Sequence, residues 1–115
     1  MPPAPTAHAH SHARPPRKPK LVSEASCVRA AALFRALGDV HRLRVIEWLA
    51  TGERCVGELA ESAGTKMSTL SQQLRVLRQE RIVKQRREGK HVYYSLADAH
   101  VQELVLAALQ HVEEG

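Results

Sequence analysis

The sequence predicts a mainly α-helical domain with one small β-hairpin, in the element order α-α-α-α-β-β-α. Apolar residues recur at helical spacing through most of the chain after residue 20. Residues 82–96 instead carry two runs of β-forming residues around a glycine turn. With 115 residues, of which only 3% are aromatic, the chain is long enough for one domain with a core of Leu, Val, Ile and Ala.

The N-terminal segment differs in composition from the rest of the chain. Residues 1–20 contain all six prolines, together with His8, His10 and His12 and four basic residues. Such a segment cannot bury enough apolar surface to fold. We therefore expect a disordered tail over residues 1–20 and a folded domain over residues 21–115.

Two helices are expected at the start of this domain. The first covers about Glu24 to Leu37 and ends at Gly38, and the second covers about Val40 to Ala50 after the capping residue Asp39. The residues expected to face the core are Val28, Ala31, Ala32, Leu37, Leu43, Ile46, Trp48 and Leu49.

Two shorter helical patterns follow, over residues 55–63 and 67–80. The connection Gly64-Thr65-Lys66 has the length and turn chemistry of a helix-turn-helix. In the second helix Leu70, Leu74 and Leu77 recur at helical spacing, so they are predicted to pack inward. Short polar side chains on the outer surface suit base contacts in a DNA major groove. The candidate DNA-reading residues are Ser68, Thr69, Ser71, Gln72, Gln73 and Arg75.

A hairpin with a basic tip is expected directly after this helix. Its strands are residues 82–85 and 91–96, and its turn is residues 86–90. In this position it looks like the wing of a winged helix. Arg86, Arg87 and Lys90 would then contact phosphates or lie near the minor groove.

The charge of the chain is concentrated in segments. The net charge is +5, yet residues 66–91 contain eight basic and two acidic residues, and residues 92–115 contain four acidic residues and no Lys or Arg. A solvated basic face is the plain interpretation of such a run. A phosphate-facing surface beside a metal-binding one explains both segments.

The last helix, expected from Asp98 to about Glu113, carries two pairs of metal-competent side chains. Asp98 and His100 form one pair, and His111 and Glu114 form the other. The histidines are eleven residues apart, so they face nearly the same way but lie about 16 Å apart along the axis. Two antiparallel copies would bring opposite pairs together into two tetrahedral N/O sites. The spacing therefore predicts a homodimer whose seam binds metal.

Each of these four residues also has a simpler explanation, as a helix-capping acid, an exposed histidine or a frayed end. The four residues occur on a helix that also carries a continuous apolar stripe. A helix at a dimer interface is the simplest explanation of both features. The stripe consists of Val101, Leu104, Val105, Ala108, Leu109 and Val112.

Several functional classes are not expected from the sequence. No apolar run approaches the roughly 20 residues of a membrane span and no signal-peptide core is present, so we expect a cytoplasmic protein with no membrane partner. The two cysteines, Cys27 and Cys55, do not make a disulfide framework. No nucleophile with a base, phosphate-binding glycine loop or catalytic carboxylate pair is found, so neither an enzyme nor a small-molecule substrate is expected.

Four ordered motifs resemble the ArsR/SmtB family of dimeric winged-helix repressors, which release operator DNA when they bind metal. They are LGDVHRLR at 37–44, CVGELA at 55–60, LSQQLRVLR at 70–78 and REGKHVYYSL at 87–96. The resemblance covers about residues 25–114. The pairs Asp98/His100 and His111/Glu114 match the zinc-sensing branch in type and spacing. The resemblance thus implies a zinc-responsive repressor of efflux or sequestration genes that binds operator double-stranded DNA.

The sequence departs from other branches of the family. Arsenic- and cadmium-sensing members usually carry Cys-Val-Cys where this chain has Gly57, which disfavours a soft thiolate site. Lys66 stands where a small capping residue is usual, which leaves the start of the reading helix open. Some relatives imply a second site, here Cys55 and Glu58 with two of His8, His10 and His12. The alternative is that Cys55 is a buried small residue, Glu58 is a solvated helix residue and the tail binds metal weakly. Cys27 is expected in the core.

Zinc suits a tetrahedral N/O site, but Co²⁺ fits the same geometry, and Ni²⁺ would fit with added tail histidines. Two other functions compete with a metal-responsive repressor. One is a repressor of the same fold that is switched by oxidation of Cys27 and Cys55. The other is a metal-storage or delivery protein that uses the histidine-rich tail and does not bind specific DNA.

Overall fold

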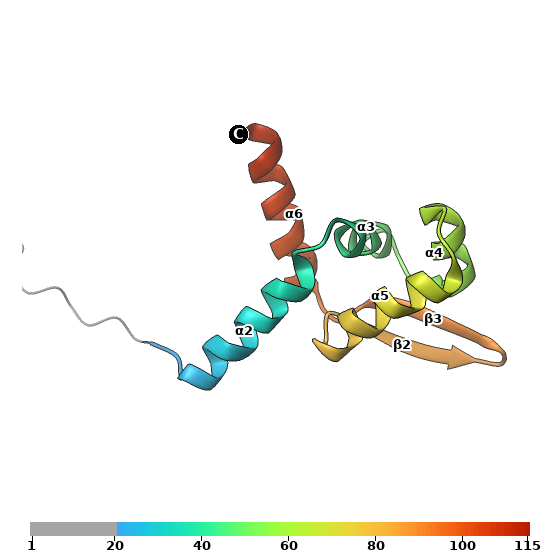
Figure 1. Cartoon of the computed structure of the whole chain (residues 1–115), viewed down its shortest axis with the longest axis horizontal. Coiled ribbons are helices and arrows are strands. Elements are labelled where there is room, and N and C mark those ends of the chain that lie inside the picture. The colour runs from blue at the N-terminus through green and yellow to red at the C-terminus, as the bar shows by residue number, and fades with distance from the viewer. Residues whose placement is uncertain (1–20) are drawn as a thin grey trace, which may run out of the picture.

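The structure, a computed structural model, describes residues 21–115. This part of the chain forms five helices and three short strands (Figure 1). Their bounds are α2 Glu24–Leu37, α3 Val40–Leu49, β1 Arg54–Cys55, α4 Val56–Ala63, α5 Met67–Gln79, β2 Val83–Glu88, β3 His91–Leu96 and α6 Ala99–Glu114. The predicted N-terminal tail, with its three histidines, lies outside the described residues.

Local capping explains where three of the helices begin. Ser23, Asp39 and Asp98 precede α2, α3 and α6, and the side chain of each accepts a hydrogen bond from a first-turn backbone N–H at 2.9 to 3.2 Å. Such caps satisfy donors that have no partner inside the helix. The predicted starts of the first two helices are confirmed, and α6 begins one residue later than predicted because Asp98 is its cap.

Helices α4 and α5 form the predicted helix-turn-helix. Gly64 ends α4 with a φ of 63°, a left-handed conformation that glycine adopts without a steric penalty. Cys55 is the N-cap of α4 and not its first residue. Lys66 occupies the N-cap position of α5 without a side-chain hydrogen bond, and α5 nevertheless begins at Met67 as predicted.

The sheet is antiparallel, with strand order β1-β3-β2. The predicted end of the first hairpin strand was wrong, because β2 continues to Glu88, which pairs with His91. The turn is therefore the two residues Gly89-Lys90, and Gly89 has the positive φ, 62°, that such a tight turn needs. Strand β1 was not predicted, since two residues carry no periodic signal of their own.

The core is aliphatic and lies between α3, α4, α5 and the start of β2. The predicted inward leucines of α5, Leu70, Leu74 and Leu77, are at most 1% exposed. Ile46 of α3 and Ile82 before β2 are equally buried and close the core around them. The core thus holds α5 by one face and leaves its opposite face to solvent.

Helices α2 and α6 lie at the end of the domain away from α4 and the hairpin turn (Figure 1). The prediction that Val28 and Ala31 of α2 are buried was wrong for a single chain, because Val28 is 59% exposed and Ala31 is also exposed. Cys27, also expected in the core, is exposed. On α6, Val101 and Val105 are buried, whereas Leu104 and Val112 are exposed. Both helices therefore carry more apolar surface than a single chain buries.

None of the helices described in residues 21–115 has the length and hydropathy that crossing a membrane requires.

Candidate functional site

The outer face of α5 is a polar stripe. Ser68, Ser71, Gln72 and Arg75 are all exposed and recur at helical spacing, directly opposite the buried leucines. Thr69 is exposed on the flank of this stripe. These side chains combine hydrogen-bond donors and acceptors with one positive charge, so they can meet base edges and phosphates.

Gln73 does not share the position of the other predicted reading residues. It is half-buried, and its Oε1 accepts a hydrogen bond from Nη1 of Arg42 at 3.0 Å. The sequence prediction that placed Gln73 on the outer surface is therefore corrected. Its neighbour Gln72 has the same side chain but is exposed.

A groove of about 720 Å³ separates α5 from the hairpin. Ser71 and Arg78 of α5 line it together with Arg87 and Lys90 of the hairpin. Arg78 was missed in the sequence, although it is three residues after Arg75 and therefore continues the same exposed stripe. One concave surface thus carries three cations next to the polar stripe.

Arg86 is engaged within the protein. It lies in β2 and not in the turn, and its guanidinium donates to both carboxylate oxygens of Glu53 at 2.7 to 3.2 Å and also to Glu88. It also lies 4.7 Å from the centre of the Tyr93 ring. The hydrogen bond from Arg86 lowers the pKa of Glu53, and the two carboxylates raise the pKa of Arg86 above its ordinary value. Two acids therefore offset its charge, and Glu53 is a residue that the sequence did not single out.

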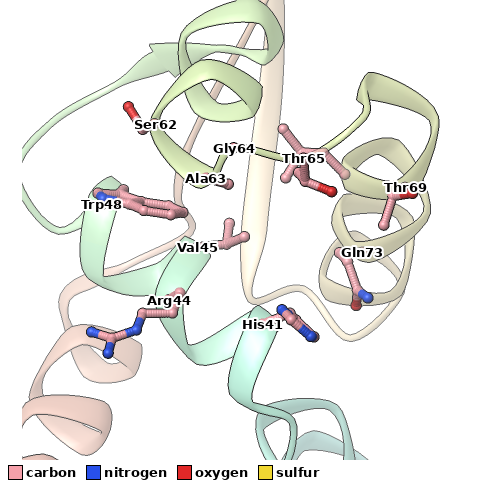
Figure 2. Close-up of a pocket in the computed structure, with 11 residues that line it drawn as sticks. His41, Arg44, Val45, Trp48, Ser62, Ala63, Gly64, Thr65, Thr69 and Gln73 are labelled. Carbon is pink, nitrogen blue, oxygen red and sulfur yellow. The ribbon is translucent and has the colours of Figure 1, made fainter.

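A second pocket, of about 400 Å³, lies between α3 and the helix-turn-helix (Figure 2). Its lining includes His41 and Trp48 of α3, Thr65 of the turn, and Thr69 and Gln73 of α5. None of the metal-competent residues of α6 lines it. The sequence did not predict this pocket, because two segments that are separate in the sequence, residues 41–48 and 62–73, form it.

The first predicted metal-ligand pair lies together at the start of α6. Nδ1 of His100 is 3.5 Å from Oδ1 of Asp98, and the two side chains are 90% and 54% exposed. Oδ1 of Asp98 accepts the capping hydrogen bonds from the N–H groups of His100 and Val101. A carboxylate has a second oxygen, so Asp98 can cap the helix and bind a metal at once.

The second pair lies at the other end of α6. His111 and Glu114 are exposed, and Oε2 of Glu114 accepts a hydrogen bond from Gln110 at 3.0 Å. Among residues 21–115, no group of three His, Cys, Asp or Glu side chains is close enough to hold a metal ion. The two predicted ligand pairs thus lie at opposite ends of α6 and do not come together within one chain.

The predicted second metal site is only partly within the described residues. Cys55 is half-buried, and its backbone N–H donates to Oε1 of Glu58 at 3.0 Å, which lowers the pKa of Glu58. Glu58 therefore already has a structural role as part of the cap of α4. The other predicted ligands, His8 and His12, lie outside the described residues.

Comparison with known proteins places this arrangement in a family. Residues 39–85 match the family model described as "Bacterial regulatory protein, arsR family". A transcriptional repressor SmtB homolog of Synechocystis sp. is 43% identical over 97 residues, which cover 84% of this chain and 74% of that protein. A cadmium resistance regulatory protein, a CadC homolog of Staphylococcus aureus, is 38% identical over 99 residues, covering 85% of this chain and 82% of that protein.

A solved structure from Mycobacterium bovis has the same fold. It is a homodimeric winged helix-turn-helix DNA-binding domain, 31% identical to this chain, with a TM-score of 0.72 over 85% of this chain and 91% of that one. The residues that match the family model, 39–85, include the helix-turn-helix with the polar stripe of α5 and the start of the hairpin. The chain belongs to the arsR family of bacterial regulatory proteins and is a winged helix-turn-helix transcriptional regulator, not an enzyme.

Proposed function

We propose that this protein is a zinc-responsive transcriptional repressor. It binds operator DNA as a homodimer in its metal-free form and releases the DNA when zinc binds between the α6 helices of the two chains. The observation that carries this proposal is the presence of the two predicted ligand pairs on α6, each exposed and each too small to hold a metal alone. The regulated genes would serve metal efflux or sequestration, in line with the cadmium resistance named for one relative.

The surface that would join the two chains lies between the two ligand pairs. Leu104 is 38% exposed and lies on the same side of α6 as His100 and His111, because these positions fall within a narrow sector at 100° per residue. Ala108 and Val112 continue the exposed apolar surface toward the C-terminus. Two antiparallel copies of α6 would bury these side chains and bring Asp98 and His100 of one chain beside His111 and Glu114 of the other.

The four side chains fit zinc in their donor chemistry. Two imidazole nitrogens and two carboxylate oxygens are a common ligand set for a tetrahedral zinc ion, and Co²⁺ takes the same geometry. Bound zinc would cross-link the two α6 helices and so favour one arrangement of the dimer. The histidines must be neutral to bind metal, so protons compete with zinc for these side chains.

A second metal site remains a subsidiary proposal. Cys55 and Glu58 would combine with His8 and His12 from the tail of the other chain. Glu58 would then have to share its carboxylate with the N–H of Cys55, which already binds it. This would make the second site weaker than the α6 site.

DNA would be bound by the polar stripe of α5 and by the cationic groove beside it. In a dimer the two α5 helices would enter successive major grooves about 34 Å apart on an inverted repeat. Ser68, Ser71, Gln72 and Arg75 would meet base edges and nearby phosphates. Arg78, Arg87 and Lys90 would meet phosphates, whereas Arg86 would remain bound to Glu53 and Glu88.

Two consecutive arginines of the hairpin give a matched test of this interface. Arg87→Ala should weaken operator binding about 5- to 10-fold and lower the slope of log affinity against log salt by about 1, because one phosphate contact is lost. Arg86→Ala should leave the salt slope unchanged, since its charge is already offset. Fluorescence anisotropy at several salt concentrations measures both, and an equal loss of slope in Arg86→Ala would contradict this assignment.

A charge placed on the α6 surface tests whether the metal site is shared. Leu104→Glu should give a monomer that binds Co²⁺ at least about 100-fold more weakly, because two ligands of each site are lost with the partner. Sedimentation measures the oligomeric state, and the visible absorption of tetrahedral Co²⁺ reports the site.

Leu106→Glu is the control for this experiment. Leu106 is on the same helix and is 45% exposed, but it lies on the opposite side from the histidines. This variant should remain a dimer with the Co²⁺ spectrum of the wild type. A Leu104→Glu monomer that still binds Co²⁺ tightly would refute the shared site.

The thiol-switch alternative gains no support from the fold. Cys27 lies on α2 and Cys55 precedes α4, and these helices are at opposite ends of the domain (Figure 1). A disulfide needs Cα atoms within about 7 Å, so the two thiols of one chain could pair only if the fold opened.

A further inference from the structure

Arg42, in the first turn of α3, connects two other helices. Its Nε donates to the backbone carbonyl of Ala36, and its Nη2 donates to that of Arg35 at 3.4 Å, both in the last turn of α2. Its Nη1 donates to Oε1 of Gln73, in the middle of α5, at 3.0 Å. One half-buried guanidinium therefore joins the end of α2 to the helix proposed to read DNA.

The chemistry of this connection makes it directional. The last carbonyls of a helix have no partner inside the helix, and a cation at this end is also favoured by the helix dipole. The guanidinium is planar, with its donors in a fixed fork. Once α2 fixes the orientation of Arg42, the direction in which Nη1 points toward α5 is fixed as well.

Gln73 is placed to receive this hydrogen bond. On α5 it lies between the buried leucines and the exposed polar stripe, on the side that faces α3. Figure 2 shows it at the edge of the pocket between α3 and α5, which His41 also lines. Gln72 has the same side chain but is exposed on the outer stripe.

We propose that Arg42 and Gln73 are a positioning pair that fixes the rotation of α5 relative to the end of α2. The inference rests on the proposed DNA binding by α5. Both side chains are half-buried and bonded to each other, away from the exposed polar stripe. The pair therefore sets the affinity for every operator sequence equally and does not select a base pair. Helix α2 also exposes Val28 and Phe34, apolar side chains that a single chain does not bury.

The connection itself can be tested without DNA by a double-mutant cycle on unfolding of the full-length dimer. Arg42→Met and Gln73→Met each remove one partner. The double variant should have a folded-to-unfolded ratio about 5-fold higher than the two single effects multiplied together predict. The reason is that the second substitution removes a hydrogen bond that the first has already broken. Arg42→Lys replaces Arg42→Met if that variant does not fold. Additive effects would overturn the proposal.

The consequence for DNA is tested on a panel of operator fragments that each differ by one base pair. Gln73→Met should weaken binding to every fragment by about the same factor, roughly 10-fold. Gln73→Glu keeps the oxygen that accepts from Arg42 and should restore binding to within about 3-fold of wild type. A residue that only filled space would be replaced equally well by Met, so this rescue distinguishes a positioning hydrogen bond from packing.

Gln72→Met is the matched control, and it should lose selectivity at particular base pairs with no coupling to Arg42. Base-specific loss in Gln73→Met, or failure of Gln73→Glu to restore binding, would overturn the positioning role. If the cycle shows coupling but the wild-type protein binds no operator fragment, the pair stands and the proposed DNA-binding function fails.

Discussion

His111→Ala is expected to leave operator binding of the metal-free protein within about 2-fold of wild type and to abolish release by zinc. His111 is exposed at the end of α6 and makes no side-chain hydrogen bond or ion pair within residues 21–115, so its removal should not disturb the fold. The wild-type response should be about 5- to 150-fold in affinity, the usual range for two coupled binding equilibria. Operator binding with and without zinc measures both quantities.

Two consecutive glutamates provide the control for this prediction. Glu114→Gln should weaken the zinc response because it replaces a charged ligand with a neutral amide. Glu113→Gln should retain the response, since Glu113 faces α3 beside Leu43 and Leu109, away from the histidines. A His111→Ala protein that zinc still releases at wild-type concentrations would show that the α6 pairs are not the regulatory site.

Leu74→Ala is expected to lower the free energy of unfolding by about 3 to 4 kcal/mol. Leu74 is fully buried at the centre of the face by which α5 is held. The cavity left by the lost side chain would loosen the reading helix, so operator binding should fall with stability. Urea unfolding at one fixed chain concentration measures the change, because the stability of a dimer depends on concentration.

Leu106→Ala is the comparison for this effect. It removes the same atoms from a side chain that is 45% exposed, so the expected loss is below about 1 kcal/mol. Similar losses in both variants would mean that burial in the single chain does not describe the core of the dimer.

Helix positions were largely predictable from the sequence because their signals are local. Ser23, Asp39 and Asp98 each bind an N–H two or three residues away, and Gly64 adopts its left-handed conformation without help from distant residues. The leucines of α5 were also placed correctly, because a buried stripe at helical spacing needs only one core to explain it.

The strands were less predictable because their pairing depends on distant residues. After Val83, every residue of β2 is exposed, so no alternation of apolar and polar residues marks its end. Its length is set by pairing with β3 up to Glu88 and His91. For the same reason, the local sequence pattern placed Arg86 in the turn. Its partner Glu53 is 33 residues earlier, so the residues near Arg86 did not indicate this ion pair.

The candidate sites show the same division. The predicted ligand pairs of α6 rest on sequence spacing alone, whereas the hydrogen bond of Gln73 involves Arg42, 31 residues away. The apolar side of α2 predicted burial of Val28, which is exposed in one chain. A hydrophobic pattern reports that a surface needs a partner, but it does not distinguish the core of the same chain from a second copy.

The most direct test of the proposed function is the binding of a labelled inverted-repeat operator fragment, taken from upstream of the chain's own gene, to the full-length protein. It is titrated with zinc, cobalt, nickel and an oxidant at one fixed salt concentration. The proposed function predicts tight binding by the metal-free dimer and release by zinc at low concentration, with cobalt next in effect and no release by the oxidant. Tight binding that is insensitive to every metal but lost on oxidation would contradict it and assign the switch to Cys27 and Cys55.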